Sequence, residues 1–117
     1  MADGAALIWS PFAGRADAEA AAGTLLEAGL IACANILPGM ISLYTWQGER
    51  GRSEEVAMLC KTTVAALDAA VAKLAEIHPY ACPAIVGWRA DAPAPATLAW
   101  LAAETGKNVQ STAQEQD

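Results

Sequence analysis

The stretch from Ile31 to Thr63 constrains the fold of this 117-residue chain more than any other part of the sequence. Strand-favouring residues run from Ile31 to Trp46 and resume from Val56 to Thr63. The nine residues between them, 47–55, include two glycines and five charged side chains, a composition that predicts a solvated connection. Because strands usually have about 5–6 residues, we expect part of this long hairpin to pair with or pack on another subunit.

Pro38 and Gly39 interrupt the first strand of this hairpin and predict a bulge or bend there. Beyond them the side chains alternate between two faces. One face carries Met40, Ser42, Tyr44 and Trp46, and the other carries Ile41, Leu43 and Thr45. On the returning strand, Val56, Met58 and Cys60 oppose Ala57, Leu59 and Lys61. The hairpin therefore has two distinct surfaces.

The remaining elements are short and follow in a regular order. We expect strands at residues 5–10 and 84–88, helices at 15–28 and 64–78, and a closing helix at 97–104. Gly29 is a natural residue to end the first helix, Thr63 is a candidate N-cap for the second, and Pro79 cannot continue it.

The order β-α-β-β-α-β plus a terminal helix predicts an α/β (α+β) fold of the ferredoxin-like sandwich type. Its antiparallel sheet would have four strands, with both helices on one face. A monomer would leave the other face bare, so we expect a symmetric neighbour to cover it. We assign residues 1–107 to this single domain and residues 108–117 to a polar, disordered tail.

Composition narrows the classes of partner. Thirteen acidic against seven basic residues give a net charge of −6, which opposes binding to nucleic acid or to an anionic membrane surface. We identify neither a signal peptide nor an apolar stretch long enough for a membrane helix, so we expect a cytoplasmic protein. Three widely spaced cysteines fit neither a disulfide framework nor a zinc knuckle and indicate free thiols.

Four motifs together resemble one known family. They are residues 32–39 (ACANILPG), residues 42–48 (SLYTWQG), Glu55 with Lys61-Thr62, and His78-Pro79-Tyr80 with Pro83. In order and spacing, over about residues 5 to 101, the chain resembles the CutA family of divalent-cation tolerance proteins. The resemblance implies a ferredoxin-like homotrimer whose long hairpins extend the sheets across subunit boundaries. It also implies a role in copper or zinc tolerance and in the response to metal ions, by metal binding or scaffolding without catalysis.

Three features depart from the family pattern. The first loop reads Ser10-Pro11-Phe12-Ala13-Gly14-Arg15, where family members commonly begin with a Thr-x-x-Pro-Asp-like turn. Trp9 stands where some bacterial relatives have a cysteine proposed as a copper ligand, and an indole cannot replace a thiolate. Thr97 stands where a tyrosine is common.

His78 is the predicted metal ligand, because the resemblance places a proposed metal at the equivalent histidine and imidazole binds Cu²⁺ and Zn²⁺ well. A tight site needs partners, so we name Cys33 as a second ligand and expect Cu²⁺ or another divalent cation to be held weakly. Convergence of Cys33 and Cys60 on His78, or three copies of His78 meeting in a trimer, would supply the ligands. The alternative is a structural role for His78 at the end of its helix.

A second candidate site combines Tyr44, Trp46, Lys61 and Tyr80 in a cleft between subunits. These side chains could accept a small anion or carboxylate. The alternative is that the aromatic residues pack at the trimer interface and that Lys61 forms an ion pair with Glu55 or with a neighbour.

Catalytic signatures give no lead: we find no Ser-His-Asp set, phosphate loop or dinucleotide fingerprint, and we expect no enzyme activity. The alternative function is a small-ligand-sensing signalling trimer that uses clefts between subunits. The compact nine-residue connection at 47–55 argues against the long effector loop of such sensors. A purely structural, partner-binding trimer remains a third class.

Overall fold

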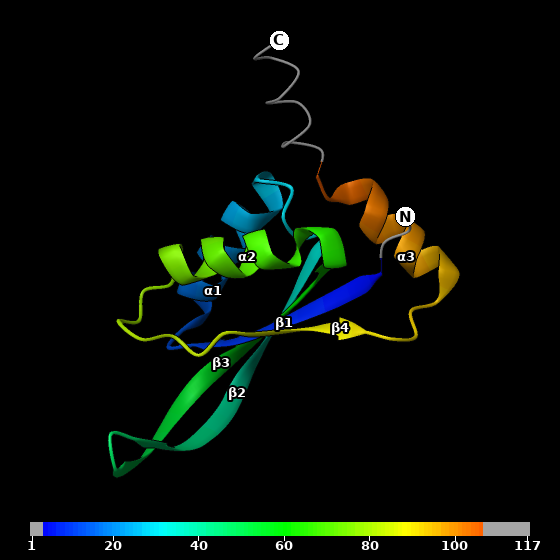
Figure 1. The fold of residues 1–117 in the computed structure, drawn as a ribbon. Coiled ribbons are helices and arrows are strands. Elements are labelled where there is room, and N and C mark those ends of the chain that lie inside the picture. The colour runs from blue at the N-terminus through cyan, green and yellow to red at the C-terminus, as the bar shows by residue number, and fades with distance from the viewer. Residues whose placement is uncertain (1–3, 107–117) are drawn as a thin grey trace.

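The computed structural model describes residues 4–106, which form four strands and three helices. In chain order they are β1 (Ala5–Phe12), α1 (Arg15–Glu27), β2 (Cys33–Trp46), β3 (Glu49–Thr63), α2 (Val64–Ile77), β4 (Val86–Ala90) and α3 (Pro95–Glu104). The sheet order is β2-β3-β1-β4, and every neighbouring pair is antiparallel. α1 and α2 lie on the same side of this sheet (Figure 1). The predicted ferredoxin-like fold is confirmed.

The core lies between the sheet and these two helices. Ile8 and Phe12 of β1 and Met58 of β3 alternate onto the helix side, where they meet Leu25 of α1 and Leu74 of α2. All five side chains are fully buried. The alanines of α1 let this helix lie close to the sheet, since Ala18, Ala21 and Ala22 are buried as well.

Local chemistry sets the helix ends much as the sequence predicts. The hydroxyl of Thr63 accepts a hydrogen bond from the Ala66 N–H, 3.3 Å away, and so caps α2. After α1, Gly29 takes a positive φ of 72°, and the Leu30 N–H donates to the Leu25 carbonyl in a Schellman arrangement.

Several strand and helix boundaries differ from the prediction. β1 continues through Pro11 to Phe12, which is tolerated because the pairing of β1 with β4 ends at Trp9. β4 begins two residues later than predicted, at Val86, and α3 begins at Pro95, since proline is favoured in the first turn of a helix.

The connection at residues 47–55 is a correction. Only Gln47 and Gly48 form the turn, with φ of 53° and 82°, and β3 already begins at Glu49. Two positive φ values in succession suit a tight hairpin turn that matches the strand twist. The five charged residues within 49–55 are therefore strand residues, which is possible because none of residues 49–55 is buried. We call residues 38–55 the distal hairpin; it projects from the rest of the molecule (Figure 1).

Pro38 and Gly39 form the predicted bulge. Between Leu37 and Met40 the register of β2 against β3 shifts, because two residues of β2 oppose one of β3, and Gly39 has a φ of 80°. This bulge marks the point where the hairpin leaves the helix-covered part of the sheet.

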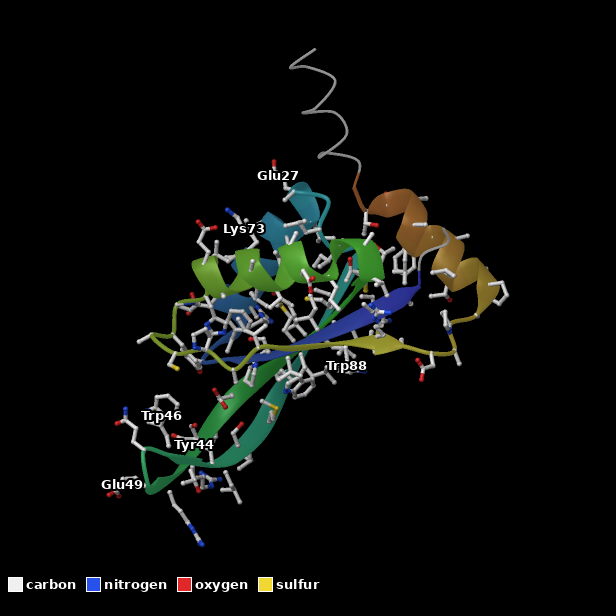
Figure 2. All side chains as sticks on the ribbon, in the orientation of Figure 1. Glu27, Tyr44, Trp46, Glu49, Lys73 and Trp88 are labelled. Carbon is white, nitrogen blue, oxygen red and sulfur yellow. The ribbon has the colours of Figure 1, made fainter. Side chains whose placement is uncertain are left out.

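The sheet face opposite α1 and α2 is apolar and partly exposed. We call it the open face; it carries Leu7 and Trp9 of β1, Leu37 of β2 and Val86 and Trp88 of β4. Leu37, Val86 and Trp88 are 52%, 58% and 42% exposed. Trp88 points away from α1 and α2 (Figure 2).

In residues 4–106, no helix is both long enough and apolar enough to cross a membrane. The predicted disordered tail, residues 108–117, lies outside the described residues.

Candidate functional site

A groove of about 650 Å³ lies between the distal hairpin and the segment that follows α2. We call it the aromatic groove. Its lining consists of Pro11, Ser42, Tyr44, Thr45, Trp46, Ser53, Glu55, Tyr80, Ala81, Cys82, Pro83 and Ala84. Trp46 projects from the hairpin toward the segment after α2 (Figure 2). Three of the four side chains predicted for a cleft, Tyr44, Trp46 and Tyr80, therefore line one groove within a single chain.

Strand alternation and a glycine place the two hairpin aromatics. Tyr44 and Trp46 are two residues apart on β2 and so share a face, and Tyr44 pairs with Gly51 of β3. A Cβ atom at Gly51 would lie 2.3 Å from Cε1 of the Tyr44 ring. Gly51 is thus required for Tyr44 to lie across the neighbouring strand.

His78 positions the other wall of the groove. Its Nδ1 accepts a hydrogen bond from the Tyr80 N–H at 3.1 Å, so Nε2 carries the proton and donates to the Pro11 carbonyl at 2.9 Å. The ring also stacks on Phe12, with centroids 4.1 Å apart. These contacts fasten the start of the segment after α2 to β1.

Tyr80 joins that wall to the hairpin. Its hydroxyl donates a hydrogen bond to Oε2 of Glu55 over 2.7 Å. Burial raises the pKa of Tyr80 above its ordinary value of 10.0, and the hydrogen bond and negative charge of Glu55 raise it further. The phenol therefore stays protonated at neutral pH.

Lys61, the fourth residue predicted for the cleft, is not in the groove. It lies six residues beyond Glu55 along β3, about 20 Å at 3.3 Å per residue, and it pairs with Leu7 and Cys33. A single chain thus does not bring Lys61 together with the three aromatic residues. The charged residue in the groove is Glu55 instead, so the predicted preference for an anion does not fit this chain.

Sequence reasoning missed Glu55 because it assigned this residue to a solvated turn. A signal was present in the hairpin itself. With Gln47 and Gly48 as a two-residue turn, Glu49, Gly51, Ser53 and Glu55 fall opposite Trp46, Tyr44, Ser42 and Met40. That register places the Glu55 carboxylate on the same face as the aromatic side chains.

The predicted metal ligands do not form a centre in the described chain. His78 is 6% exposed and both its ring nitrogens are hydrogen-bonded. The Cys33 thiol donates to Oδ1 of Asn35 at 3.7 Å. Cys33 pairs with Lys61, which lies four residues along β3 from Ala57, the pairing partner of Pro11. Within residues 4–106, no group of three or more His, Cys, Asp or Glu side chains could hold a metal ion.

Cys60 does not complete such a site either. It lies on the helix side of β3, whereas Cys33, opposite Lys61, is on the open face. Burial, with a smaller contribution from Cys33, raises the pKa of Cys60 from 9.0 to about 12, so the thiol is protonated at neutral pH. A metal ligand must be a thiolate. The donor set of one chain therefore does not fit a resident metal.

Comparison with known protein families identifies one family whose model matches almost the whole described chain. Residues 6–104 match the family model described as CutA1 divalent ion tolerance protein. This chain belongs to the CutA1 family.

Several curated relatives carry the name "Divalent-cation tolerance protein CutA". The one from Thermus thermophilus is 38% identical over 89 residues, which cover 76% of this chain and 86% of the relative. The one from Salmonella newport is 41% identical over 71 residues, which cover 61% of this chain and 62% of the relative. The solved structure of CutA from Synechococcus elongatus is similar with a TM-score of 0.80 and 36% identity, covering 89% of this chain and 91% of that one.

In this CutA1 family member, Trp9 and Thr97 fall outside the groove, whereas Pro11 of the divergent first loop lines it. Trp9 lies on the open face, paired with Leu59 and Val86, and Thr97 is exposed near the start of α3. The indole of Trp9 offers only an N–H donor and no metal ligand.

Proposed function

We propose that this protein is a cytoplasmic homotrimer that contributes to tolerance of divalent copper and zinc. It acts through weak metal contacts or as a scaffold, without catalysis. Membership of the CutA1 family supports the link to divalent cations, since that is the property named by the family and by its curated relatives.

The exposed apolar residues of the open face are the main support for a trimer. Leu37, Val86 and Trp88 are each more than two fifths exposed on this face. A contiguous apolar surface of this kind favours association, and closed symmetry lets identical copies cover one another. The distal hairpin supports the same proposal, because Ile41 and Leu43 are 47% and 75% exposed on the strand face opposite Tyr44 and Trp46.

In this proposal the metal is bound by side chains of different copies, which trimer formation brings together. Cys33 is partly exposed at the open face, where copies would meet. His78 is the poorer ligand, because a metal would first have to displace its hydrogen bonds to Pro11 and Tyr80. Weak binding follows, since each ligand comes from a different chain or gives up an existing contact.

The proposal of a non-catalytic role rests on the same histidine. It is the only histidine in the sequence, and its two occupied ring nitrogens leave it no free site to act as a general base.

Light scattering and calorimetry on the reduced protein test this proposal together. We expect three times the 12.1 kDa chain mass and Cu²⁺ or Zn²⁺ binding no tighter than about 100 μM, near −5.5 kcal/mol. Cys33→Ser should weaken that binding, whereas Cys82→Ser, a change at an exposed thiol in the aromatic groove, should not. A monomeric mass would overturn the trimer. Tight binding that His78→Ala abolishes would restore His78 as the ligand.

A small-ligand-sensing trimer is the second candidate, and the aromatic groove favours it. The groove has the size of a small-molecule site and combines aromatic walls with a few polar groups. A thermal-shift screen with metabolites separates the two candidates, because a ligand that binds only the folded state raises the melting temperature.

A further inference from the structure

The charge of the aromatic groove comes from a single residue. Of the twelve lining residues, Glu55 is the only charged one. Ser42 and Ser53 contribute hydroxyl groups, and the remaining lining residues are uncharged. The groove therefore has a negative potential, and the net charge of −6 on the whole chain reinforces it.

The Glu55 carboxylate is not neutralised by another part of the described chain. Oε2 accepts the Tyr80 hydroxyl, and the ion pairs Arg15–Glu19 and Lys73–Glu76 lie on helix surfaces and do not involve Glu55. The nearby arginines of the hairpin face the other way. Arg50 and Arg52 pair with Thr45 and Leu43, on the strand face opposite Tyr44 and Trp46.

Three aromatic rings border the same space as this carboxylate. Tyr44 and Trp46 come from β2 and are each about half exposed, and Tyr80 comes from the segment after α2. The face of an aromatic ring is electron-rich and attracts a cation, with Trp the strongest of the three types. Aromatic walls with one carboxylate form the surroundings that quaternary ammonium groups prefer.

We propose that the aromatic groove binds a small organic cation of the quaternary or tertiary ammonium class. Trp46, Tyr44 and Tyr80 contact its alkyl groups, and Glu55 balances its charge. A divalent metal fits less well, because the lining offers one carboxylate and no imidazole, whereas such an ion needs several oxygen or nitrogen ligands. The proposal goes beyond the role in metal tolerance and does not depend on it.

Calorimetric titration with choline tests whether the groove recognises the positive charge of the ligand. The neutral isostere 3,3-dimethyl-1-butanol, which has the same shape as choline, is the control. We expect choline to bind about tenfold or more tightly than the isostere, since only choline gains from Glu55 and the ring faces. Equal binding of the two compounds, or no binding of choline, would contradict the proposal.

Two substitutions on β3 separate the groove carboxylate from the general acidity of the chain. Glu55→Gln keeps an oxygen that can accept the Tyr80 hydroxyl, so the fold is retained, and it should weaken choline binding about fivefold or more. Glu54→Gln removes the same charge one residue away on the opposite strand face, where Glu54 pairs with Ile41. It should leave choline binding unchanged. Equal effects of the two changes would overturn the assignment of Glu55.

Trp46→Leu tests the aromatic wall while keeping an apolar side chain, and it should weaken choline binding about tenfold. Lys61→Ala tests a competing occupant, the ammonium group of a second copy of this chain. If the wild-type protein ignores choline and Lys61→Ala binds it, the groove belongs to the subunit interface and the proposal is wrong.

Discussion

The helix-covered part of the sheet and the distal hairpin share the same backbone pairing but differ in what covers their side chains. In the helix-covered part, residues such as Ile8, Leu25 and Leu74 are completely buried between the sheet and α1 or α2. Among residues 38–55 none is buried. Ladder hydrogen bonds run through both regions. What differs is the apolar surface that each removes from water.

This difference explains how the two regions are stabilised. The helix-covered part closes its own core, so it accounts for most of the stability of the single chain. A two-stranded ribbon is marginal by itself. The distal hairpin therefore depends on local contacts, such as Tyr44 over Gly51 and Tyr80 to Glu55, and on cover from another copy.

The largest expected effect comes from deleting a core side chain. Leu74→Ala should lower the free energy of unfolding by about 3 kcal/mol, because Leu74 is fully buried and the change leaves a cavity. Leu43→Ala is the matched change in the hairpin and should cost about 0.5 kcal/mol or less for the single chain. Urea unfolding at two protein concentrations measures both.

Equal effects of the two leucine substitutions would contradict the proposed difference in stabilisation between the helix-covered part of the sheet and the distal hairpin. A loss at Leu43 that shrinks on dilution would sharpen this comparison, since only an interface between copies makes stability depend on concentration.

A change at His78 comes next. His78→Ala should destabilise the protein by about 2 kcal/mol, because it removes the stacking on Phe12 and leaves the Pro11 carbonyl and the Tyr80 N–H without their partner. His78→Asn is the control and should recover part of the loss, since its amide oxygen can replace Nδ1. Thermal unfolding with and without a chelator measures the effect. A loss seen only when metal is present would mean that His78 is a ligand.

Gly51→Ala tests how the distal hairpin is held together. The added Cβ would meet the Tyr44 ring, so the ring must move, and we expect a cost of about 1 kcal/mol that is confined to the hairpin. Hydrogen exchange should show faster opening of residues 40–54 and unchanged protection of the core. In a Tyr44→Ala background the same substitution should cost nothing. An equal cost in both backgrounds would place its origin elsewhere.

The last prediction concerns the hydrogen bond between the two regions. Tyr80→Phe should cost about 1 kcal/mol at pH 7, because the Glu55 carboxylate loses a donor. The pKa of Tyr80 is raised in the folded state, so its contribution is complete below pH 10 and declines as the pH rises further.

Denaturant unfolding between pH 8 and pH 11 measures this dependence. Cys60 also has a raised pKa, so the stability of both proteins should fall above pH 9. The difference between wild type and Tyr80→Phe isolates Tyr80 and should shrink above pH 10. A difference that stays constant with pH would show that the phenol does not titrate against folding.

The sequence alone determined the order of the elements and the features that depend on neighbouring residues. Thr63 caps α2, Gly29 ends α1 and Pro38-Gly39 forms a bulge, because capping and dihedral preferences act over three or four residues. The family pattern followed from the same local motifs, which is why the fold could be predicted with its sheet topology.

Only the tertiary structure decided which distant residues meet. The strand register places Glu55 in the aromatic groove and Lys61 outside it. That register depends on a turn of two residues, where the sequence pattern predicts a connection of nine. Packing fixed the role of His78, since its hydrogen bond to Pro11 joins positions 67 residues apart. Such contacts depend on how whole elements pack, and no local pattern in the sequence records which partner a buried side chain will find.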